Sequence, residues 1–195
     1  ASTGGSVTIT APTNVAGSFV YNLVSVQNVG ASVCTRNITG QSVTVNITAD
    51  ATIALTSAVG TNNQTVCINN PIVNITYAVG GSGTGGSVIG LPVGVTGVYA
   101  GGVVTISGTP TVSGSFPYTV STTGPCVIPT ATGTINVTAD ATIALTSVAG
   151  SDNQTLCINT PLLTNITYNV GGSGTGGIVA GLPTGITGVY AGGIV

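Results

Sequence analysis

Apolar and polar residues alternate along most of this chain in short runs, and glycine or proline separates one run from the next. A period of two places successive side chains on opposite faces of a strand, whereas an amphipathic helix needs a period near 3.6. Val, Ile and Thr dominate the runs and suit a pleated, half-buried surface. The pattern predicts an all-β chain with essentially no helix. The clearest predicted strands span residues 51–57, 64–68, 72–79, 87–90, 95–99, 102–107, 114–122 and 130–138.

The run GSFPYTVST at 114–122 shows which side chains should enter the core. Alternation places Phe116, Tyr118 and Val120 on one face, which is the apolar one. The opposite face carries Ser115, Pro117 and Thr119. Because proline has no N–H, Pro117 predicts an outward position without a ladder hydrogen bond, or a bulge.

The chain contains an internal repeat. TADATIALTS occurs at residues 48–57 and again at 138–147. Other motifs return at nearly the same offset: QTVCIN (64–69) as QTLCIN (154–159), NITY at 74–77 and 165–168, and GVYAGG at 97–102 and 188–193. Self-similarity at a fixed period is typical of tandem repeat proteins.

The period divides the chain into three parts. ITAPTNVAGSFVYNL at 9–23 resembles ISGTPTVSGSFPYTV at 106–120. We therefore expect residues 1–48 to be the C-terminal part of one repeat, 49–138 a complete repeat (the central repeat), and 139–195 the N-terminal part of a third. Seven or eight strands in about 90 residues predict tandem immunoglobulin-like β-sandwiches. Since a partial repeat cannot close its core alone, we expect a longer array.

Charge is nearly absent and this narrows the function. Only 2% of residues are charged, namely Arg36, Asp50, Asp140 and Asp152, against about 25% in an ordinary domain. One arginine cannot neutralise a row of phosphates, which argues against nucleic-acid binding. Proton-transfer catalysis usually needs His, Glu, Lys or paired carboxylates, so we expect no enzyme and no cofactor. No apolar run reaches the roughly 18 residues of a membrane span.

GGSGTGG occurs at 80–86 and again at 171–177, and the first copy contains G-x-G-x-x-G. A dinucleotide loop of this kind leads into a helix and is followed about 20 residues later by an acidic residue. Here SVIGLPVGVTG follows, with strand-forming residues and a proline, and no acidic residue comes at that distance. We interpret the segment as a flexible glycine connection between strands.

The four cysteines, two per period, are Cys34, Cys67, Cys126 and Cys157. An even, periodic set predicts disulfides in a chain that looks secreted, and the absence of His and of C-x-x-C argues against zinc. The simplest connectivity joins Cys67 to Cys126 within the central repeat, and we favour it slightly. The alternative is that these two lie at opposite ends of the sandwich and that each cysteine pairs across a junction, stapling neighbouring repeats.

Other candidate sites have a simpler structural interpretation. Asp50 and Asp140 occupy equivalent boundary positions, where each could bind calcium, but one carboxylate per boundary favours a turn or cap residue. A stacking surface could be formed by Tyr77, Tyr99, Tyr168 and Tyr190, but we expect these tyrosines to be core residues.

N-x-T sequons, which are glycan acceptors in eukaryotic secreted proteins, occur at Asn37, Asn46, Asn63, Asn74, Asn136, Asn153 and Asn165. Because Asn and Thr are abundant, we attribute most of these to coincidence.

The stretch GLPVGVTGVYAGGVVTISGTPTVSGSFPYTVSTTG (90–124) resembles the Ig-like repeats of giant Bacteroidetes cell-surface adhesins, and TADATIAL and QTVCIN are similar to repeats of flavobacterial gliding-motility adhesins. The resemblance implies an extracellular filament at the cell surface, exported by type IX secretion and moved by the gliding machinery. Its partners would be neighbouring repeats, the secretion and gliding machinery, and an external surface or polysaccharide. The family offers no catalytic motif.

The sequence thus favours a structural shaft within an adhesin filament. Two alternatives remain open. The repeats could themselves bind glycans or surfaces, or outward rows of Thr could drive assembly of an extracellular fibre or sheath.

Overall fold

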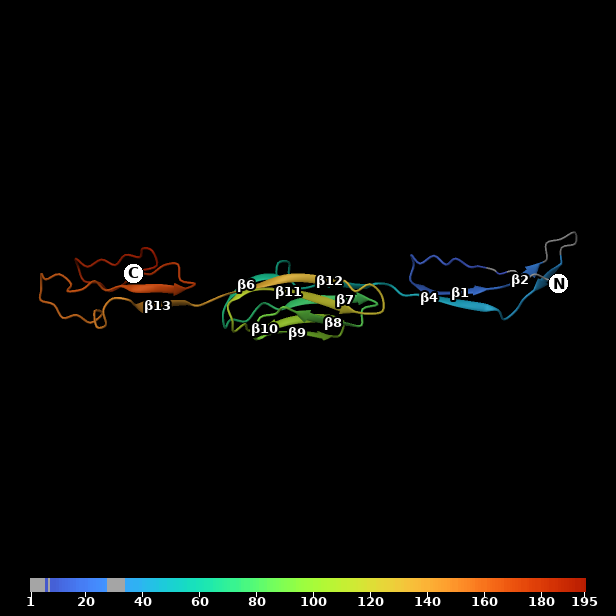
Figure 1. The fold of residues 1–195 in the computed structure, drawn as a ribbon, viewed down its shortest axis with the longest axis horizontal. Helices are drawn as coiled ribbons and strands as arrows, with labels where there is room; N and C mark the ends of the chain where they lie inside the picture. The colour runs from blue at the N-terminus through green and yellow to red at the C-terminus, as the bar shows by residue number, and fades with distance from the viewer. Residues whose placement is uncertain (1–5, 7, 28–33) are drawn as a thin grey trace.

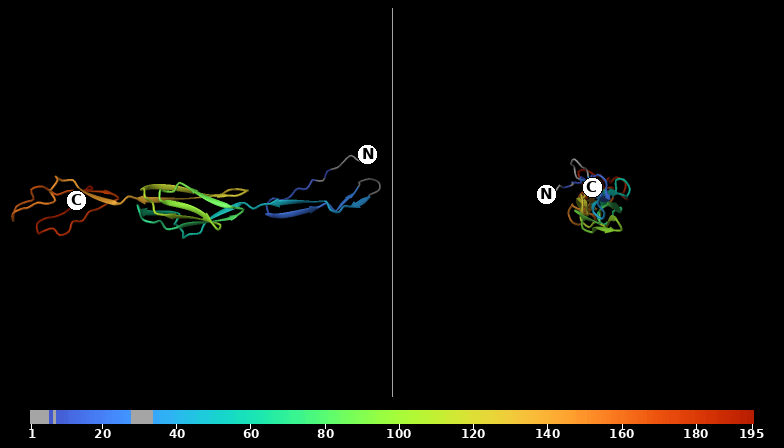
Figure 2. Two further views of the ribbon diagram at one scale, coloured as in Figure 1. Left: turned by 90° about the horizontal axis from the view of Figure 1, so that it is seen from below. Right: turned by 90° about the vertical axis from the view of Figure 1, so that its right-hand side faces the viewer.

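A computed structural model describes residues 6, 8–27 and 34–195 of the chain. Three parts follow one another along its long axis, with the central repeat in the middle (Figures 1 and 2). Within these residues all regular structure is β, as predicted. No helix among them has the length and apolar character to cross a membrane.

The central repeat is a sandwich of two four-stranded sheets. The first sheet has the order β5 (Ala51–Leu55), β7 (Ile75–Gly81), β10 (Val103–Gly108) and β9 (Val95–Ala100). The second has the order β6 (Asn63–Cys67), β12 (Thr130–Thr138), β11 (Gly114–Thr123) and β8 (Gly85–Ile89). Neighbouring strands are antiparallel except β6 and β12, which are parallel. This arrangement confirms the immunoglobulin-like sandwich.

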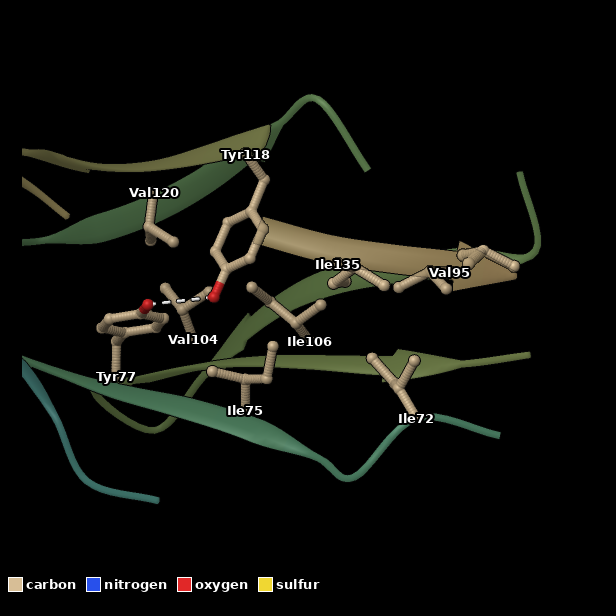
Figure 3. Packing of buried hydrophobic residues seen from close by; sticks show 10 residues of the cluster. Ile72, Ile75, Tyr77, Val95, Val104, Ile106, Tyr118, Val120 and Ile135 are labelled. Carbon is tan, nitrogen blue, oxygen red and sulfur yellow. Dashed lines mark hydrogen bonds between the residues drawn. The ribbon is translucent and has the colours of Figure 1, made fainter. Parts of the chain in front are cut away.

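The core lies between the two sheets, where their inward side chains meet (Figure 3). Its buried cluster consists of Ile72, Ile75, Tyr77, Val95, Val104, Ile106, Tyr118, Val120, Ile135 and Val137. The predicted inward face of β11 is confirmed, since Tyr118 and Val120 are buried and Phe116 packs against the cluster. Burial of this apolar surface is the main force that holds the sheets together.

Pro117 occupies a position in β11 where no inter-strand hydrogen bond needs its missing N–H, as its chemistry predicted. Its partner on β12 is Thr134, whose N–H donates to the carbonyl of Asn62 on the far side, 2.9 Å away. Since Pro117 and Thr134 therefore form a non-hydrogen-bonded pair, the Pro117 nitrogen faces the side of β8. That strand ends at Ile89, opposite Thr119, so no ladder bond is lost.

The strand predicted at 72–79 begins later, at Ile75. The reason is a side chain: the Gln64 amide accepts a hydrogen bond from Val73 N–H and donates one to Val73 C=O, each 2.9 Å long. These two backbone groups are therefore satisfied without a neighbouring strand. The alternation of apolar and polar residues cannot show that a side chain takes the place of a neighbouring strand in bonding the backbone.

The flanking parts reproduce pieces of the central sandwich. In the first part β1 (Gly17–Asn22) pairs with β4 (Ser42–Ile47), and the short strands β2 (Ser25–Gln27) and β3 (Thr35–Asn37) extend that hairpin. In the third part β13 (Ala141–Leu145) pairs with β14 (Tyr168–Gly172). The β1–β4 register, Phe19 opposite Val45, matches that of β11–β12, Phe116 opposite Ile135. The repeat found in the sequence is thus a repeat in three dimensions.

Candidate functional site

Two of the three aspartates, Asp50 and Asp140, and two of the four cysteines, Cys67 and Cys126, lie at the junctions between repeats. A Thr-Ala-Asp linker, residues 48–50, connects β4 to β5, and a second, residues 138–140, leads from the end of β12 to β13. The linkers lie at opposite ends of the central sandwich, so the chain enters at one end and leaves at the other (Figure 1). Both linkers are contacted by a glycine turn that follows a strand of the next repeat.

The glycine segment 80–86 supports the first linker. Gly81 has φ 60°, and a Cβ there would overlap the Asp50 carbonyl oxygen. Ser82 N–H donates to that same oxygen, at 3.3 Å. Only glycine combines this left-handed backbone with such a close approach.

The third part of the chain repeats this contact. Gly172 has φ 62°, a Cβ there would overlap the Asp140 carbonyl oxygen, and Ser173 N–H donates to it at 3.3 Å. The expectation of a glycine connection between strands is confirmed, since the first copy joins β7 to β8. The segment is a turn, closed by the Gly83 N–H bond to the Gly80 carbonyl at 3.0 Å, that carries the chain from β7 in one sheet to β8 (Gly85–Ile89) in the other. The element that follows it is a strand, not the helix of a dinucleotide loop.

The β11–β12 loop also holds the first linker. Val127 N–H donates to the Asp50 carboxylate at 3.4 Å, and Val127 C=O accepts from Ala51 N–H at 3.3 Å. The Asp50 side chain thus ties the linker to a distant loop, and its assignment as a turn or cap residue stays a prediction. Among the residues that the structure describes, no three His, Cys, Asp or Glu side chains gather in a group that could hold a metal ion.

The cysteines Cys67 and Cys126 lie at opposite ends of the central sandwich. Cys67 ends β6 beside Thr138, whereas Cys126 follows β11 and its thiol lies 3.6 Å from the Thr48 carbonyl oxygen. Strand β12 spans the distance between these ends, about 26 Å at roughly 3.3 Å per residue. A disulfide needs Cα atoms within about 7 Å. The favoured internal pairing therefore does not fit this structure, in which all four cysteines carry free thiols.

The remaining cysteines occupy matching places. Cys34 precedes β3 in the hairpin that corresponds to β11–β12, and Cys157 stands in QTLCIN, the counterpart of the Cys67 motif. Both are exposed. Each repeat unit thus contributes one cysteine to each of its two ends.

Two of the four candidate tyrosines, Tyr77 and Tyr99, belong to the core of the central repeat, as expected, whereas Tyr168 and Tyr190 are half-buried in the third part. Tyr77 is buried and Tyr99 packs against the buried cluster. The Tyr77 hydroxyl lies 3.1 Å from that of Tyr118, which donates to the Asn62 carbonyl at 3.2 Å. Burial, reinforced by the hydrogen bond with Tyr77, raises the pKa of Tyr118 far above its usual range.

Sequence reasoning missed the role of Gln64. Besides Val73, its amide donates to the Thr61 carbonyl at 2.9 Å, which ties β6 to the turn before it and to the segment before β7. Gln154 makes the equivalent bonds to Ser151 and Thr164. The return of Gln in QTVCIN and QTLCIN was the signal that could have pointed to it.

An apolar groove of about 780 Å³ lies in the third part. Leu162, Ile166, Tyr168, Val179, Ile186 and Val195 are among its lining residues. The counterparts of Ile166 and Tyr168 are Ile75 and Tyr77, which β11 and β12 cover in the central repeat. The groove therefore corresponds to the inner face of a sandwich, and not to a separate ligand site.

No protein-family model matches the chain. No curated protein matches it either.

Solved structures with partial similarity include a chimeric titin Z1Z2 carrying a KLER peptide from decorin, at 16% identity over 47% of this chain and 98% of that one, with a TM-score of 0.36. Domains 4–9 of the surface layer protein SbsC match at 15% identity over 80% of this chain and 24% of that one, also at 0.36. Titin domains z1z2 in complex with telethonin match at 13% identity over 64% and 65% of the two chains, with the same TM-score. This chain thus spans under two thirds of the last two.

Proposed function

We propose that this chain is a shaft segment of a long, secreted cell-surface adhesin filament that serves surface adhesion and gliding motility. The observation that carries the proposal is the position of the two linkers. Because they leave the central sandwich at opposite ends, successive repeats extend in one direction and do not fold back (Figure 2). Such an arrangement converts repeat number into length.

The junctions favour a stiff shaft. Each linker has three residues, and its Asp carbonyl accepts a hydrogen bond from the turn after β7 or from the equivalent turn after β14. At the first junction Val127 adds two further hydrogen bonds. A repeat of this kind should lengthen the filament by roughly 40 Å, given strands that rise about 3.3 Å per residue. With 2% charged residues, the packing should depend little on salt.

The location and partners in this proposal come from the sequence. The even cysteine count favours an oxidising, extracellular location. The resemblance to Bacteroidetes adhesin repeats supports type IX secretion, the gliding machinery as a partner, and a polysaccharide or other surface as the target of the full-length adhesin. The shaft itself contacts neighbouring repeats and needs no cofactor.

The proposal is tested on cells that make the protein. An antibody raised against residues 1–195 should label filaments on the outside of intact cells, and the label should move along the surface of gliding cells. Label that appears only after the cells are permeabilised would refute the proposal. A glycan array probed with the same chain should show no binding, and selective binding would instead favour a glycan-binding module.

One observation favours a second candidate, a self-assembling extracellular fibre. The outward face of the β6–β12–β11–β8 sheet carries rows of small polar side chains, such as Thr132 beside Thr119 and Asn136 beside Ser115. The Ser115 hydroxyl donates to the Asn136 side chain at 2.7 Å, which orders one such row. Lateral association of the chain in light scattering, abolished by Thr119→Lys, would support this candidate.

A further inference from the structure

We propose that a disulfide joins successive repeats at each Thr-Ala-Asp linker, between the cysteine that ends β6 of one repeat and the cysteine in the β11–β12 loop of the next. The inference rests on the proposed function only in requiring consecutive repeats. Cys67 represents the first type, and Cys126 the second.

The cysteine of the preceding repeat is fixed beside the linker by the parallel β6–β12 pair. Cys67 is the register partner of Thr138, the last residue of β12. Ile68 N–H donates to the Thr138 carbonyl at 2.8 Å, and the Thr138 hydroxyl donates to the Val66 carbonyl at 3.2 Å. Hydrogen bonds on both sides of Cys67 therefore hold it against the start of the linker.

The cysteine of the following repeat is fixed beside the linker by the β11–β12 loop. The Cys126 thiol lies 3.6 Å from the Thr48 carbonyl oxygen. Its neighbour Val127 makes the two hydrogen bonds to Asp50 and Ala51 described above. Cys126 is half-buried, whereas the other three cysteines are exposed.

Thr48 and Thr138 are equivalent residues, which brings the two cysteine types together. Both precede Ala-Asp, and both stand at the end of a strand with the same register on its hairpin partner, Thr48 directly after β4 and Thr138 as the last residue of β12. The carbonyl of this threonine accepts from Ile68 of its own repeat and is approached by Cys126 of the next one. Both cysteine types therefore lie beside the carbonyl of the same threonine, and the proposed disulfide requires their Cα atoms to come within about 7 Å.

The chemistry requires an electron acceptor. The two thiols lose two protons and two electrons as the S–S bond forms, and a disulfide such as oxidised glutathione takes them up to give two thiols. Residues 139–195 include no counterpart of the β11–β12 loop. The experiment must therefore supply that loop.

The test is a chain in which a second copy of residues 105–195 follows Val195, the counterpart of Val104, so that the third repeat is completed. The added copy carries Ile128→Val, so that its Cys126 peptide differs in mass from the original one. After oxidation with glutathione and digestion with pepsin, mass spectrometry should find Cys67 linked to the added copy of Cys126, in monomeric protein at any concentration. A Cys67–Cys126 link inside the central repeat, or a free Cys67 in the folded extended chain, would overturn the proposal.

Controls separate this outcome from nonspecific oxidation. Cys67→Ser should abolish the link, whereas Cys157→Ser should leave it intact. Cys157 is a matched control because both thiols are exposed, so nonspecific oxidation would involve either of them. If circular dichroism shows that the added residues do not fold, residues 49–100 placed before Gly4 complete the first repeat instead. The added Cys67 should then form a disulfide with Cys126. Absence of this disulfide from the folded chain would also refute the proposal. The disulfide test does not depend on the antibody labelling of intact cells, so failure of that labelling would refute the proposed function and not the disulfide.

Discussion

The hydroxyl groups of Tyr77 and Tyr118 lie 3.1 Å apart in the centre of the central repeat, and they join its two sheets (Figure 3). Because Tyr118 donates its proton to the Asn62 carbonyl, Tyr77 must donate to Tyr118. Room for this pair comes from Gly133, where a Cβ would overlap both the Tyr118 hydroxyl and the Asn62 carbonyl. The core thus contains a short series of hydrogen bonds, in which Tyr77 donates to Tyr118 and Tyr118 donates to the Asn62 carbonyl.

Tyr118→Phe should lower the free energy of unfolding by about 1–3 kcal/mol, because it leaves the buried Tyr77 hydroxyl without an acceptor. Tyr77→Phe should cost less, since Tyr118 keeps its acceptor at Asn62. Urea unfolding of both variants and the double variant measures the difference. Equal costs for the two single variants would contradict the assigned direction.

Stability should fall at high pH because the pKa of Tyr118 is raised in the folded protein by burial. The neutral phenol is favoured when folded, so its contribution is complete below the pKa near 10 of an unfolded tyrosine. It is lost above that pH, with a slope of up to about 1.4 kcal/mol per pH unit from this group. Urea unfolding between pH 8 and 11 checks this. Tyr118→Phe should show a shallower decline, and an unchanged slope would contradict the assignment.

Gly81→Ala should destabilise the first junction by about 2 kcal/mol or more. The substitution combines a left-handed backbone with overlap on the Asp50 carbonyl. Gly101→Ala is the matched control, since Gly101 has φ 56° but no atom within 4 Å of the added Cβ. That variant should lose only about 1 kcal/mol, from backbone strain. Similar losses in thermal or urea unfolding would show that contact with the linker does not matter.

Gln64→Leu should destabilise the central repeat by about 2 kcal/mol, because three hydrogen bonds of its amide are lost and each contributes about 1 kcal/mol or less. The bonds involve Thr61 and Val73. The exposed Thr65 on the same strand provides the control, and Thr65→Val should change stability by less than about 0.5 kcal/mol. Hydrogen exchange of the Val73 amide gives a local measure. Unchanged protection in Gln64→Leu would refute the role assigned to this side chain.

The sequence by itself determined the local features of this protein. Alternation placed the strands of the central repeat to within a few residues and turned Phe116, Tyr118 and Val120 inward, because side-chain direction in a strand depends only on neighbouring residues. It also assigned Pro117 to an unladdered position, since proline lacks an N–H wherever it stands. Repetition of TADATIALTS and its companions revealed the period directly.

Only the tertiary structure decided which distant residues meet. Cys67 lies at the far end from Cys126 because β6 runs parallel to β12, and strand pairing is not encoded in the alternation of either strand. Gly81 is required because the Asp50 carbonyl, far away in the sequence, packs against it. Gln64 replaces strand pairing at Val73 through its side chain. Such contacts depend on how the two sheets stack, which no short stretch of sequence determines.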